Sequence, residues 1–560
     1  MRKLRSVKVP IAFALLLTVL FSCKKNNSMT PPSASPFAVS SATVNDSSTT
    51  NRTLYGVNLS PVIKISFSSP VNTATAASYI SFFGGGRSVS CNFSFGNKDS
   101  TIICQPAAAL LPLTSYAVGV LPGLKSAQDS SIKSEFKLTF STQIDTTDKF
   151  PRITDSALLT LVEQQTFNYF WAFGHPVCGM ARERTSSGDV VTTGGSGFGI
   201  MAMLVGVQRN FISRAQALGR IDTIVNFLTN TVTRYHGAFS HWINGTTGAT
   251  VPFSTQDDGA DIVETSYMMQ GLLCARQFFN SSTDPSEINL RTSINNIYDS
   301  IQWNWFRQNG QNVLTWNWSP DFGWAINVHV QGWCEAMITY VMAASSPVDT
   351  NAIPTVVYTN GWAQNGGEKN GRSFYGITLP LGPDYGGPLF FAHYSFLGIN
   401  PNGLSDGYAN YWTQDTAHAR INYLYCVQNP NKYYLYDSAC WGLTASDIQG
   451  GYNASSPTND VGVIAPTAAI SSLPYTPTES MNALRFFYYK LGNKIWGQYG
   501  FIDAFNPTSI WFDTDCLAID QGPQIVMIEN YRSGLLWNLF MSCPEVQTGM
   551  TNLGFSSPNL

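Results

Sequence analysis

Residues 253–279 read FSTQDDGADIVETSYMMQGLLCARQFF, and this stretch decides the fold class of the larger part of the chain. Met268, Leu272 and Ala275 recur at helical spacing, so the sequence predicts a long amphipathic helix over 259–279. The alternation of apolar and polar residues that marks a half-buried strand is weak on either side of it. We therefore expect a predominantly helical fold around this segment.

Further helical stretches lie on both sides, separated by long loops rich in Gly, Trp, Tyr, Asn and Asp. They fall near 155–173, 197–208, 213–233, 287–303, 330–344, 405–425, 465–472, 477–491 and 522–541. About a dozen helices with such loops favour an α/α toroid, in which an outer helical ring wraps an inner one; a helical solenoid has the same periodicity. Long aromatic loops are typical of the walls of a substrate cleft.

Three carboxylates precede and enter the helix predicted over 259–279. Asp257, Asp261 and Glu264 stand at i, i+4 and i+7, so one helical face would carry all three. Acidic residues at a helix start also cap amides and suit the helix dipole, which accounts for Asp257 and Asp258 without a catalytic role. That explanation fits Glu264 poorly, because Glu264 lies further inside the helix. A partly buried glutamate near like charges has a raised pKa, which suits a general acid.

A second candidate segment is CWGLTASD, residues 440–447. Trp441 could stack on a sugar ring while Asp447 presents a carboxylate beside it. From the residues alone, an Asx turn or a helix cap at Asp447 is the simpler explanation. A disulfide between Cys426 and Cys440 could staple this loop in an exported protein.

A third segment, residues 379–394, forms a loop made rigid by proline and glycine. It presents Asp384, Tyr385, His393 and Tyr394 as candidate binding residues. For His393, a structural histidine with satisfied hydrogen bonds is an equally good interpretation.

A fourth segment contains Arg182, Asp189 and the glycine run TTGGSGFG at 192–199. The G-x-G-x-x-G spacing is absent and no βαβ unit surrounds the run, which excludes a dinucleotide site. We expect a tight entry to a helix over 199–208, with Asp189 or Arg182 facing the cleft.

The composition favours a neutral polar ligand. Charged residues make up only 12% of the 560 residues, where about 25% is usual, and aromatic residues make up 13%. Every tryptophan lies after residue 150, so the sugar-friendly composition belongs to the helical part. A net charge of −3 offers no basic surface for nucleic acid. A mean hydropathy of −0.04 excludes a bundle of membrane spans.

Several catalytic motifs are absent from the sequence. It contains no H-E-x-x-H, C-x-x-C, G-x-x-x-x-G-K-[ST] or G-x-S-x-G pattern. These absences argue against a catalytic zinc, phosphate chemistry and a nucleophilic serine. We therefore expect a reaction without metal or cofactor.

Residues 37–143 have a different hydrophobic pattern. Apolar and polar residues alternate with period two at 63–67 and 136–140, which predicts half-buried antiparallel strands. About seven strands in roughly 100 residues is a β-sandwich count. The pattern ISFSSPVN … LTSYAVGVLPGLKSAQDS … FKLTFST resembles the bacterial Ig-like domains that precede secreted enzymes. We interpret it as a spacer; a sugar-binding module is the alternative. Cys91 and Cys104 flank a predicted hairpin turn and could form a disulfide.

The N-terminus has the pattern of an export signal. Basic residues and then an apolar run occupy positions 2–21, and the run is too short for a transmembrane helix. Leu20-Phe21-Ser22-Cys23 resembles a bacterial lipobox, which predicts acylation of Cys23. An ordinary signal peptide or a short anchor helix is the alternative. We expect a lipoprotein signal peptide over 1–22, a flexible tether over 23–36, and an exported protein lipid-anchored to the outer membrane.

The helical part resembles glycoside hydrolase family 144, whose members are often labelled glucoamylases of Bacteroidetes. The resemblance spans about 154–546. It rests on the blocks TFNYFWAFGHPVCGMARER, VVTTGGSGFGIMAM, DDGADIVETSYMMQGLLCARQFF, FYGITLPLGPDYGGPLFFAHYSFLG, CWGLTASD, SPTNDVGVIAPTAAISSLPYTP, LRFFYYKLG and AIDQGPQIVMIENYRSGLLWNLF. It implies an all-α (α/α)6 barrel over 150–546 behind an all-β Ig-like sandwich over 37–143.

The resemblance also implies an activity: hydrolysis of β-1,2-glucan with inversion, either endo or releasing sophorose from a chain end. The family's catalytic glutamate matches Glu264 and its aspartate matches Asp447, which we expect to act as acid and base. Sugar-stacking residues are expected to be Trp242, Trp333, Tyr385, Tyr394 and Trp441, and hydroxyl-binding residues Arg182, Asp189, Asp258, Asp384, His393 and Asp520.

Two other functions remain compatible with the sequence. One is an (α/α)6 hydrolase of another glucan linkage, because pocket shape rather than fold sets the linkage. The other is a glycan-binding lipoprotein without catalytic activity. We expect a monomer whose partner is a neutral glucan, and which meets the membrane only through Cys23.

Overall fold

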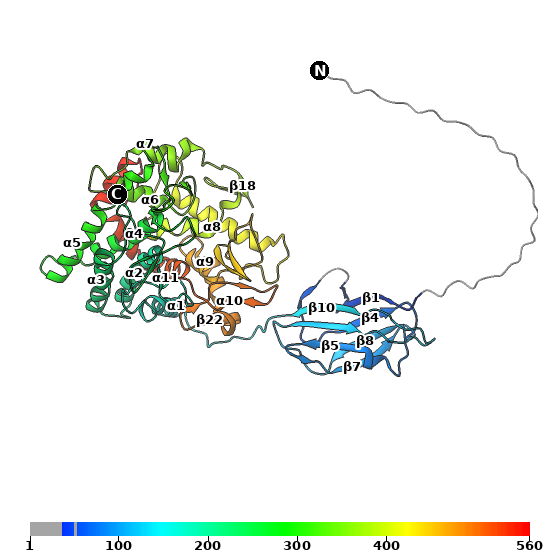
Figure 1. The fold of residues 1–560 in the computed structure, drawn as a ribbon. Helices are drawn as coiled ribbons and strands as arrows, with labels where there is room; N and C mark the ends of the chain where they lie inside the picture. The colour runs from blue at the N-terminus through cyan, green and yellow to red at the C-terminus, as the bar shows by residue number, and fades with distance from the viewer. Residues whose placement is uncertain (1–35, 50–52) are drawn as a thin grey trace, which may run out of the picture.

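The computed structural model describes residues 36–49 and 53–560, which form a β body and a helical body side by side (Figure 1). The predicted signal peptide over 1–22, the predicted lipid attachment at Cys23 and all but the last residue of the predicted tether over 23–36 lie outside these residues. In the described part of the chain, no helix combines the length and the apolar character that crossing a membrane requires.

The β body is a sandwich of two five-stranded sheets. One has the strand order β2-β1-β4-β8-β7 and the other β3-β10-β9-β5-β6. The strands are β1 (Val39–Val44), β2 (Ser47–Ser48), β3 (Leu54–Val57), β4 (Ile63–Phe67), β5 (Ile80–Gly84), β6 (Arg87–Ser88), β7 (Cys91–Gly96), β8 (Thr101–Pro106), β9 (Ser115–Val120) and β10 (Phe136–Thr142). Alternate residues of β4 are buried against the facing sheet, as the period-two pattern predicts. The expected all-β sandwich is therefore confirmed.

Neither predicted disulfide is formed. Cys91 and Cys104 are free thiols, and so are Cys426 and Cys440. In the β7–β8 hairpin Cys104 lies opposite Phe93, so Cys91 is displaced from it by two residues along the ladder. The two thiols nevertheless form a hydrogen bond that lowers the pKa of Cys91, so this register leaves them within reach of each other.

The helical body alternates between an inner and an outer layer along the chain. Inner helices α2, α4, α6, α9 and α11 form a ring in which α2 packs against α4 and α11, α4 against α6, and α11 against α9. The short 3-10 helix η7 contacts both α6 and α11 and completes the ring. The inner elements are α2 (Thr193–Gln208), α4 (Ile262–Phe278), α6 (Met337–Ala344), η7 (Ser395–Leu397), α9 (Pro466–Ser471) and α11 (Ala518–Ser533).

The outer layer covers this ring, which gives the expected (α/α)6 arrangement. For example, α1 packs across α2 and α11, and α10 packs on α9. The outer helices are α1 (Asp155–Trp171), α3 (Arg214–Asn230), α5 (Pro285–Asp299), α7 (Thr355–Val357), α8 (Tyr411–Gln428) and α10 (Pro477–Ile495). Two C-terminal helices, α12 (Leu535–Met541) and α13 (Pro544–Asn552), pack beside α4 and α6.

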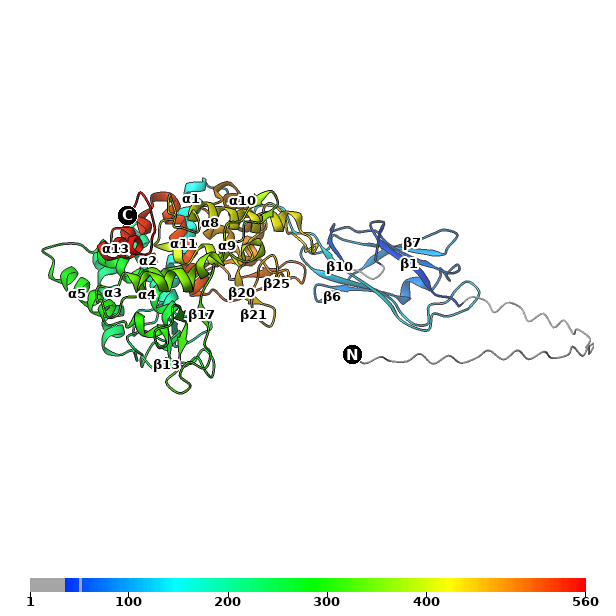
Figure 2. The ribbon, with the colours of Figure 1, turned by 90° about the horizontal axis from the view of Figure 1, so that it is seen from above.

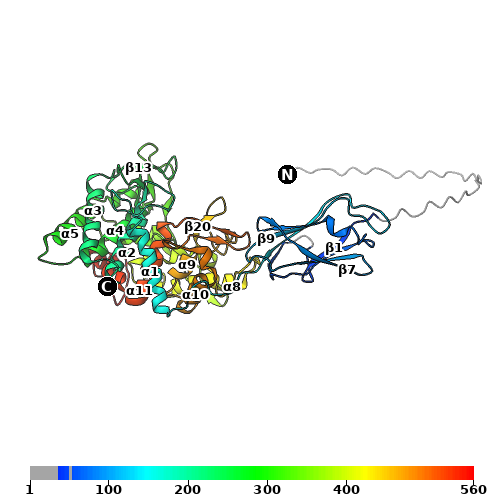
Figure 3. The ribbon, with the colours of Figure 1, turned by 90° about the horizontal axis from the view of Figure 1, so that it is seen from below.

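Short strands and loops gather on one face of the helical body. Strand β13 (Thr250–Val251) and the hairpin of β20 (Ala445–Ile448) and β21 (Gly451–Ala454) lie on this face when the molecule is seen from above and from below (Figure 2, Figure 3). The helices fill the remainder of the body, so the loops on this face are free to shape a site.

Glycines allow α2 and α4 to cross in close contact. A Cβ atom on Gly271 would lie 2.1 Å from the carbonyl oxygen of Gly197, and one on Gly197 would lie 2.2 Å from that of Tyr267. This packing explains why the glycine run is helical: α2 begins at Thr193, earlier than the predicted stretch over 197–208. Tertiary packing here outweighs the poor helix propensity of glycine.

Gly271→Ala is expected to destabilise the helical body by about 3 kcal/mol or more, because the new methyl group meets rigid backbone. Urea unfolding followed by tryptophan fluorescence measures it, since every tryptophan lies in this body. Gly219→Ala in α3 is the matched control: nothing lies within 4 Å of its Cβ position, so a gain of about 0.5–1 kcal/mol is expected. Equal effects of the two substitutions would contradict the proposed crossing.

Candidate active site

A cavity of about 410 Å³ lies where α2, α4 and α11 begin and where the chain enters α6. Thr192 precedes α2, Glu264 lies in α4, Glu335 precedes α6, and Leu517 and Ile519 flank the start of α11. Backbone N–H groups at helix N-termini favour negative charge, so this end of the barrel suits carboxylates. The aromatic wall consists of His241, Trp242, Phe253, Tyr267, Trp316, Phe390, Tyr394 and Tyr452.

Glu264 is held in this cavity by the start of α2. Its Oε2 accepts a hydrogen bond from the backbone N–H of Gly194 at 2.6 Å and one from the Thr192 hydroxyl at 3.4 Å. A Cβ on residue 194 would lie 2.6 Å from that oxygen, so only glycine allows this approach. Burial raises the pKa of Glu264 to about 7, with help from Asp261 and against the opposing effect of His241. The carboxyl group is therefore poised to carry a proton near neutral pH.

Glu335 is a second glutamate in the same cavity, and the sequence did not single it out. Burial raises its pKa to about 7, and the charges of Asp261 and Glu264 add to the rise. Its sequence signal was a lone charge in the apolar run Trp333-Cys334-Glu335-Ala336-Met337. Periodicity predicted a helix there, but the helix starts after Glu335 and leaves it in the wall of the cavity.

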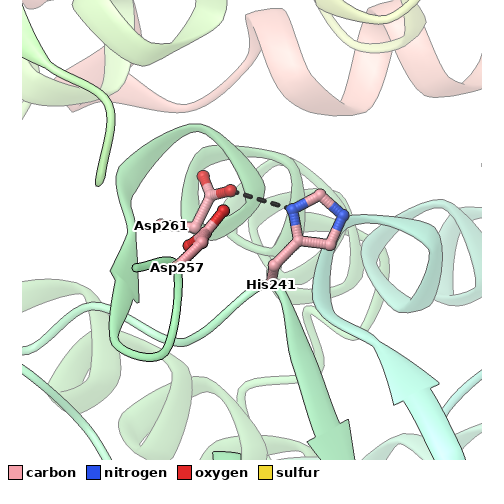
Figure 4. Close-up of side chains that lie close together, drawn as sticks. All are labelled: His241, Asp257 and Asp261. Carbon is pink, nitrogen blue, oxygen red and sulfur yellow. Dashed lines mark hydrogen bonds and ion pairs between the residues drawn. The ribbon is translucent and has the colours of Figure 1, made fainter. Parts of the chain in front are cut away.

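Asp261 and His241 form an ion pair beside Glu264 (Figure 4). The Asp261 Oδ2 lies 3.0 Å from the His241 Nδ1, and its Oδ1 accepts from the backbone N–H groups of Val263 and Glu264. The structure corrects the predicted single helical face of three carboxylates, because Asp261 is the N-cap of α4 and Asp257 lies in the preceding turn. Figure 4 nevertheless shows the Asp257 carboxylate next to that of Asp261.

The charge of His241 is set by its carboxylate neighbours. Burial alone would lower the pKa of the imidazole, but the charge of Glu264, the hydrogen bond that His241 donates to Asp261 and the charge of Asp257 together raise it to about 9. Burial also raises the pKa of Asp257 to about 6. His241 is therefore a cation at neutral pH, facing a glutamate whose charge it favours.

Asp447 lies on β20, at the mouth of an adjoining cavity of about 500 Å³. Arg184 donates from Nη1 to both carboxylate oxygens of Asp447, at 2.7 and 3.0 Å, and from Nε to Glu183. Arg184 and Tyr452 line both cavities, so the two spaces adjoin. The structure thus brings Asp447 and Glu264 to neighbouring parts of one cleft.

Two buried carboxyl groups, those of Asp503 and Asp520, lie next to Asp447. The backbone N–H of Asp447 donates to Asp503 Oδ2 at 2.7 Å. Burial and the charge of Asp520 raise the pKa of Asp503 far above its usual range, which favours its protonated form. Burial raises the pKa of Asp520 to about 7, and a hydrogen bond from Asp503 opposes the rise. The sequence predicts that Asp520 binds sugar hydroxyls. In the structure Asp520 is buried among the carboxyl groups of Asp503 and Asp447.

Two clusters in the described part of the chain have the spacing of metal ligands. His241, Asp257 and Asp261 form one, and Asp447, Asp503 and Asp513 the other, each with ligand atoms within 4.8 Å of one another. The Asp261 oxygens already bind backbone amides and His241, and the Asp447 oxygens bind Arg184. In each cluster a protein cation is thus already paired with one carboxylate, His241 with Asp261 and Arg184 with Asp447.

Of the remaining predicted residues, Trp242 and Tyr394 line the cavity around Glu264. Arg182 is engaged elsewhere and donates to the carbonyl groups of Gly188 and Phe173. Four more predicted residues lie outside this cavity: Asp189, Asp258, Asp384 and Tyr385. Asp189 pairs with His175, Asp384 pairs with Arg372, and Tyr385 packs on Phe374.

Two predicted stacking residues and one predicted hydroxyl-binding residue also lie outside this cavity. Trp441 has no exposed surface and donates from Nε1 to the Glu479 carbonyl, so it is a core residue and not a stacking platform. His393 is 2% exposed and pairs through Nε2 with the Ser472 hydroxyl, an arrangement that favours its structural interpretation. Trp333 is 4% exposed and lines a different cavity.

Comparisons with known proteins identify relatives of both bodies of the chain. A family model described as "Putative glucoamylase" matches residues 327–544, and one described as "Bacterial Ig-like domain" matches 33–142. The exo β-1,2-glucooligosaccharide sophorohydrolase (non-reducing end) of Parabacteroides distasonis is 44% identical over 423 residues, which cover 72% of this chain. The aligned part is 58% of that relative's length, less than two thirds of it.

Two solved structures are similar over larger shares of their own chains. The endo-β-1,2-glucanase of Chitinophaga pinensis, in complex with sophorotriose and glucose, is 49% identical with a TM-score of 0.71, over 73% of this chain and 100% of that one. The β-1,2-glucanase of Parabacteroides distasonis is 36% identical with a TM-score of 0.70, over 93% of this chain and 74% of that one.

Proposed function

Because this chain belongs to glycoside hydrolase family 144, we propose that it hydrolyses the β-1,2 linkages of glucans. The observation that carries the proposal is the cavity containing Glu264 and Glu335, whose carboxyl groups both have a pKa raised to about 7. Relatives named for action on β-1,2-glucan and on its oligosaccharides supply the linkage. They include an exo- and an endo-acting enzyme, so the proposal concerns the linkage and not the position of the cut.

The proposed reaction is a single displacement with inversion. In this chemistry a carboxylic acid protonates the leaving oxygen, while a carboxylate activates a water on the opposite face of the sugar, with the two groups about 6.5–9.5 Å apart. Glu264 is proposed to donate the proton. Asp447, oriented by Arg184 in the adjoining cavity, is proposed to activate the water.

The walls of the cavity suit a neutral sugar chain. Trp242 and Tyr394 offer aromatic faces, and His241 is proposed to donate a hydrogen bond to a sugar hydroxyl. Fixed aromatic and polar groups of this kind orient a substrate before reaction, which lowers the entropic part of the barrier.

His241→Gln is expected to move the alkaline limb of the kcat/KM profile to higher pH. A general acid must be protonated, so activity falls as pH rises through the pKa of Glu264, about 7. The cation at His241 lowers the pKa of Glu264. Removing this cation therefore raises the pKa of Glu264 and extends activity to higher pH. Initial rates between about pH 5 and 9 measure the shift.

His236→Gln is the matched control for this shift. The His236 ring stacks on Trp305 with the ring centroids 3.5 Å apart, and this histidine does not line the cavity. Its variant should keep the wild-type limb. An alkaline limb that stays in place, or moves to lower pH, in His241→Gln would contradict the proposed coupling.

The linkage is tested by incubating the purified protein with linear β-1,2-glucan, laminarin and maltooligosaccharides. Products from β-1,2-glucan alone are expected. Products from starch-type substrates alone would contradict the linkage and favour a hydrolase of another glucan. Binding without any product would favour a glycan-binding protein.

We also propose that the protein is exported and anchored through a lipid on Cys23, with the Ig-like sandwich as a spacer. The lipobox-like sequence at 20–23 supports this proposal. Cys23→Ser is expected to move the protein from the membrane fraction to the soluble fraction. Continued sedimentation of the variant with the envelope would rule out lipid anchoring.

A further inference from the structure

A separate cavity of about 420 Å³ lies behind the loops that enter the active site. Residues 331–333 line it just before Glu335, and Pro383 lines it a few residues before Phe390, which lies in the catalytic wall. It shares no lining residue with the cavity around Glu264. Its size falls in the lower part of the range of about 300–1,000 Å³ for small-molecule sites.

Two buried polar side chains in the wall of this cavity lack partners. Glu368 is 5% exposed and neither carboxyl oxygen has a hydrogen-bond partner among the described residues. Trp333 is 4% exposed and its Nε1 likewise has none. A buried polar group without a partner costs about 1–3 kcal/mol, so the pair indicates that something absent from the protein itself completes the site.

The surrounding loop holds these groups in place. The Glu368 carbonyl accepts from Gly382 N–H, and Asn370 Nδ2 donates to the Gly382 carbonyl, both at 2.8 Å. Gly382 has a φ of +91° and lies against the Trp333 ring, where a Cβ would come within 2.6 Å. The part of the wall around Glu368 and Trp333 is thus formed by the fold, and exposed side chains of Gln331, Gln364, Lys369 and Arg372 complete the lining.

The lining chemistry selects a neutral ligand with hydroxyl groups. A metal ion is disfavoured because Glu368 is the only carboxylate in the lining, and Lys369 and Arg372 stand beside it. An anion is disfavoured because the two cations in the lining are engaged elsewhere, Arg372 with Asp384 and Lys369 over the Tyr408 ring. A sugar hydroxyl can donate to the carboxyl oxygen and accept from the indole N–H, and the amides of Gln331 and Gln364 can do both.

We propose that this cavity is a second glucosyl-binding site, which holds a unit of a long β-1,2-glucan chain away from the bond being cut. The inference rests on the proposed function. Short oligosaccharides that fill only the catalytic cavity would not reach it. The cavity therefore adds affinity for long chains and leaves the chemical step unchanged.

The test compares kinetics on long β-1,2-glucan with kinetics on the shortest sophorooligosaccharide that the wild type cleaves. Glu368→Met and Gln331→Ala each remove the hydrogen-bonding group, so each is expected to raise KM for the long chain about tenfold, with kcat unchanged and with unchanged kinetics on the short substrate. Burial raises the pKa of Glu368 to about 8, so the side chain is uncharged near neutral pH and an apolar side chain of similar length is compatible with folding. Gln331 is exposed, so its truncation leaves the core intact.

Glu479→Gln on α10 is the matched control and should resemble the wild type on both substrates. Unchanged KM on the long chain in both cavity variants would overturn the inference, and so would equal rises on long and short substrates. A wild-type protein that cleaves no β-1,2-glucan would instead contradict the proposed function. The two failures are therefore distinguishable.

Discussion

Glu264→Gln is expected to lower kcat on β-1,2-glucan by about 10²–10⁴-fold, the usual contribution of a general acid. The amide has nearly the shape of the acid and its oxygen can still accept from the Gly194 N–H, so the barrel should remain folded. What is lost is the proton that burial keeps on the carboxyl group near neutral pH. Initial rates, together with an unchanged unfolding midpoint, measure the effect.

Glu335→Gln is the matched variant, because Glu335 lies in the same cavity with the same raised pKa. A β-linked glycosyl fluoride separates the two roles, since fluoride departs without needing a proton. The proton donor's variant should be impaired on glucan but nearly normal on the fluoride. If Glu335→Gln shows that pattern and Glu264→Gln does not, the donor is Glu335 and the assignment made here is wrong.

Asp447→Asn is expected to lower kcat by a similar factor of about 10²–10⁴, because the amide cannot take the proton from the attacking water. Arg184 keeps its bonds to Glu183, so the loop that presents residue 447 should stay in place. Steady-state kinetics with thermal unfolding as a folding check measure the change.

Asp189→Asn is the control for Asp447. The sequence placed Asp189 near the cleft, but its side chain is 63% exposed and pairs with His175 outside the cavity. Its variant should keep activity close to wild type. An Asp447→Asn enzyme within tenfold of the wild type would remove Asp447 from the role of base.

Outer helices were the most predictable elements of this fold. The stretches predicted over 155–173 and 213–233 match α1 and α3 to within a few residues. Each has an apolar stripe against the ring and a capping residue before it, Thr154 and Ser213. Both signals are local, so a single sequence contains them.

The first and last residues of the inner helices were harder to predict, because these helices are buried on all sides. In α2 the glycines argued for a loop, yet they permit the contact with α4 and with Glu264. The stretch predicted over 522–541 is interrupted at Gly534, whose φ of +70° ends α11 and starts α12. Periodicity gave no sign of either feature, since neither depends on an amphipathic face.

The site was predictable only where its chemistry is local. The acidic run before the helix predicts like charges near Glu264, and the place of Glu264 inside the helix predicts its burial. The structure confirms both. Arg184 meets Asp447 across 263 positions of sequence, a contact that no spacing rule reveals. Glu335 reaches the cavity because α6 starts after it, and helix starts are the least certain part of such predictions.

The most direct test of the account follows the first product of cleavage of linear β-1,2-glucan by proton NMR. Hydrolysis at the β-1,2 linkage with inversion predicts that the new reducing end appears first as the α-anomer and then equilibrates. A β-anomer appearing first would contradict the inverting roles proposed for Glu264 and Asp447. A spectrum of uncleaved glucan after long incubation would contradict the proposal that the protein hydrolyses β-1,2-glucan.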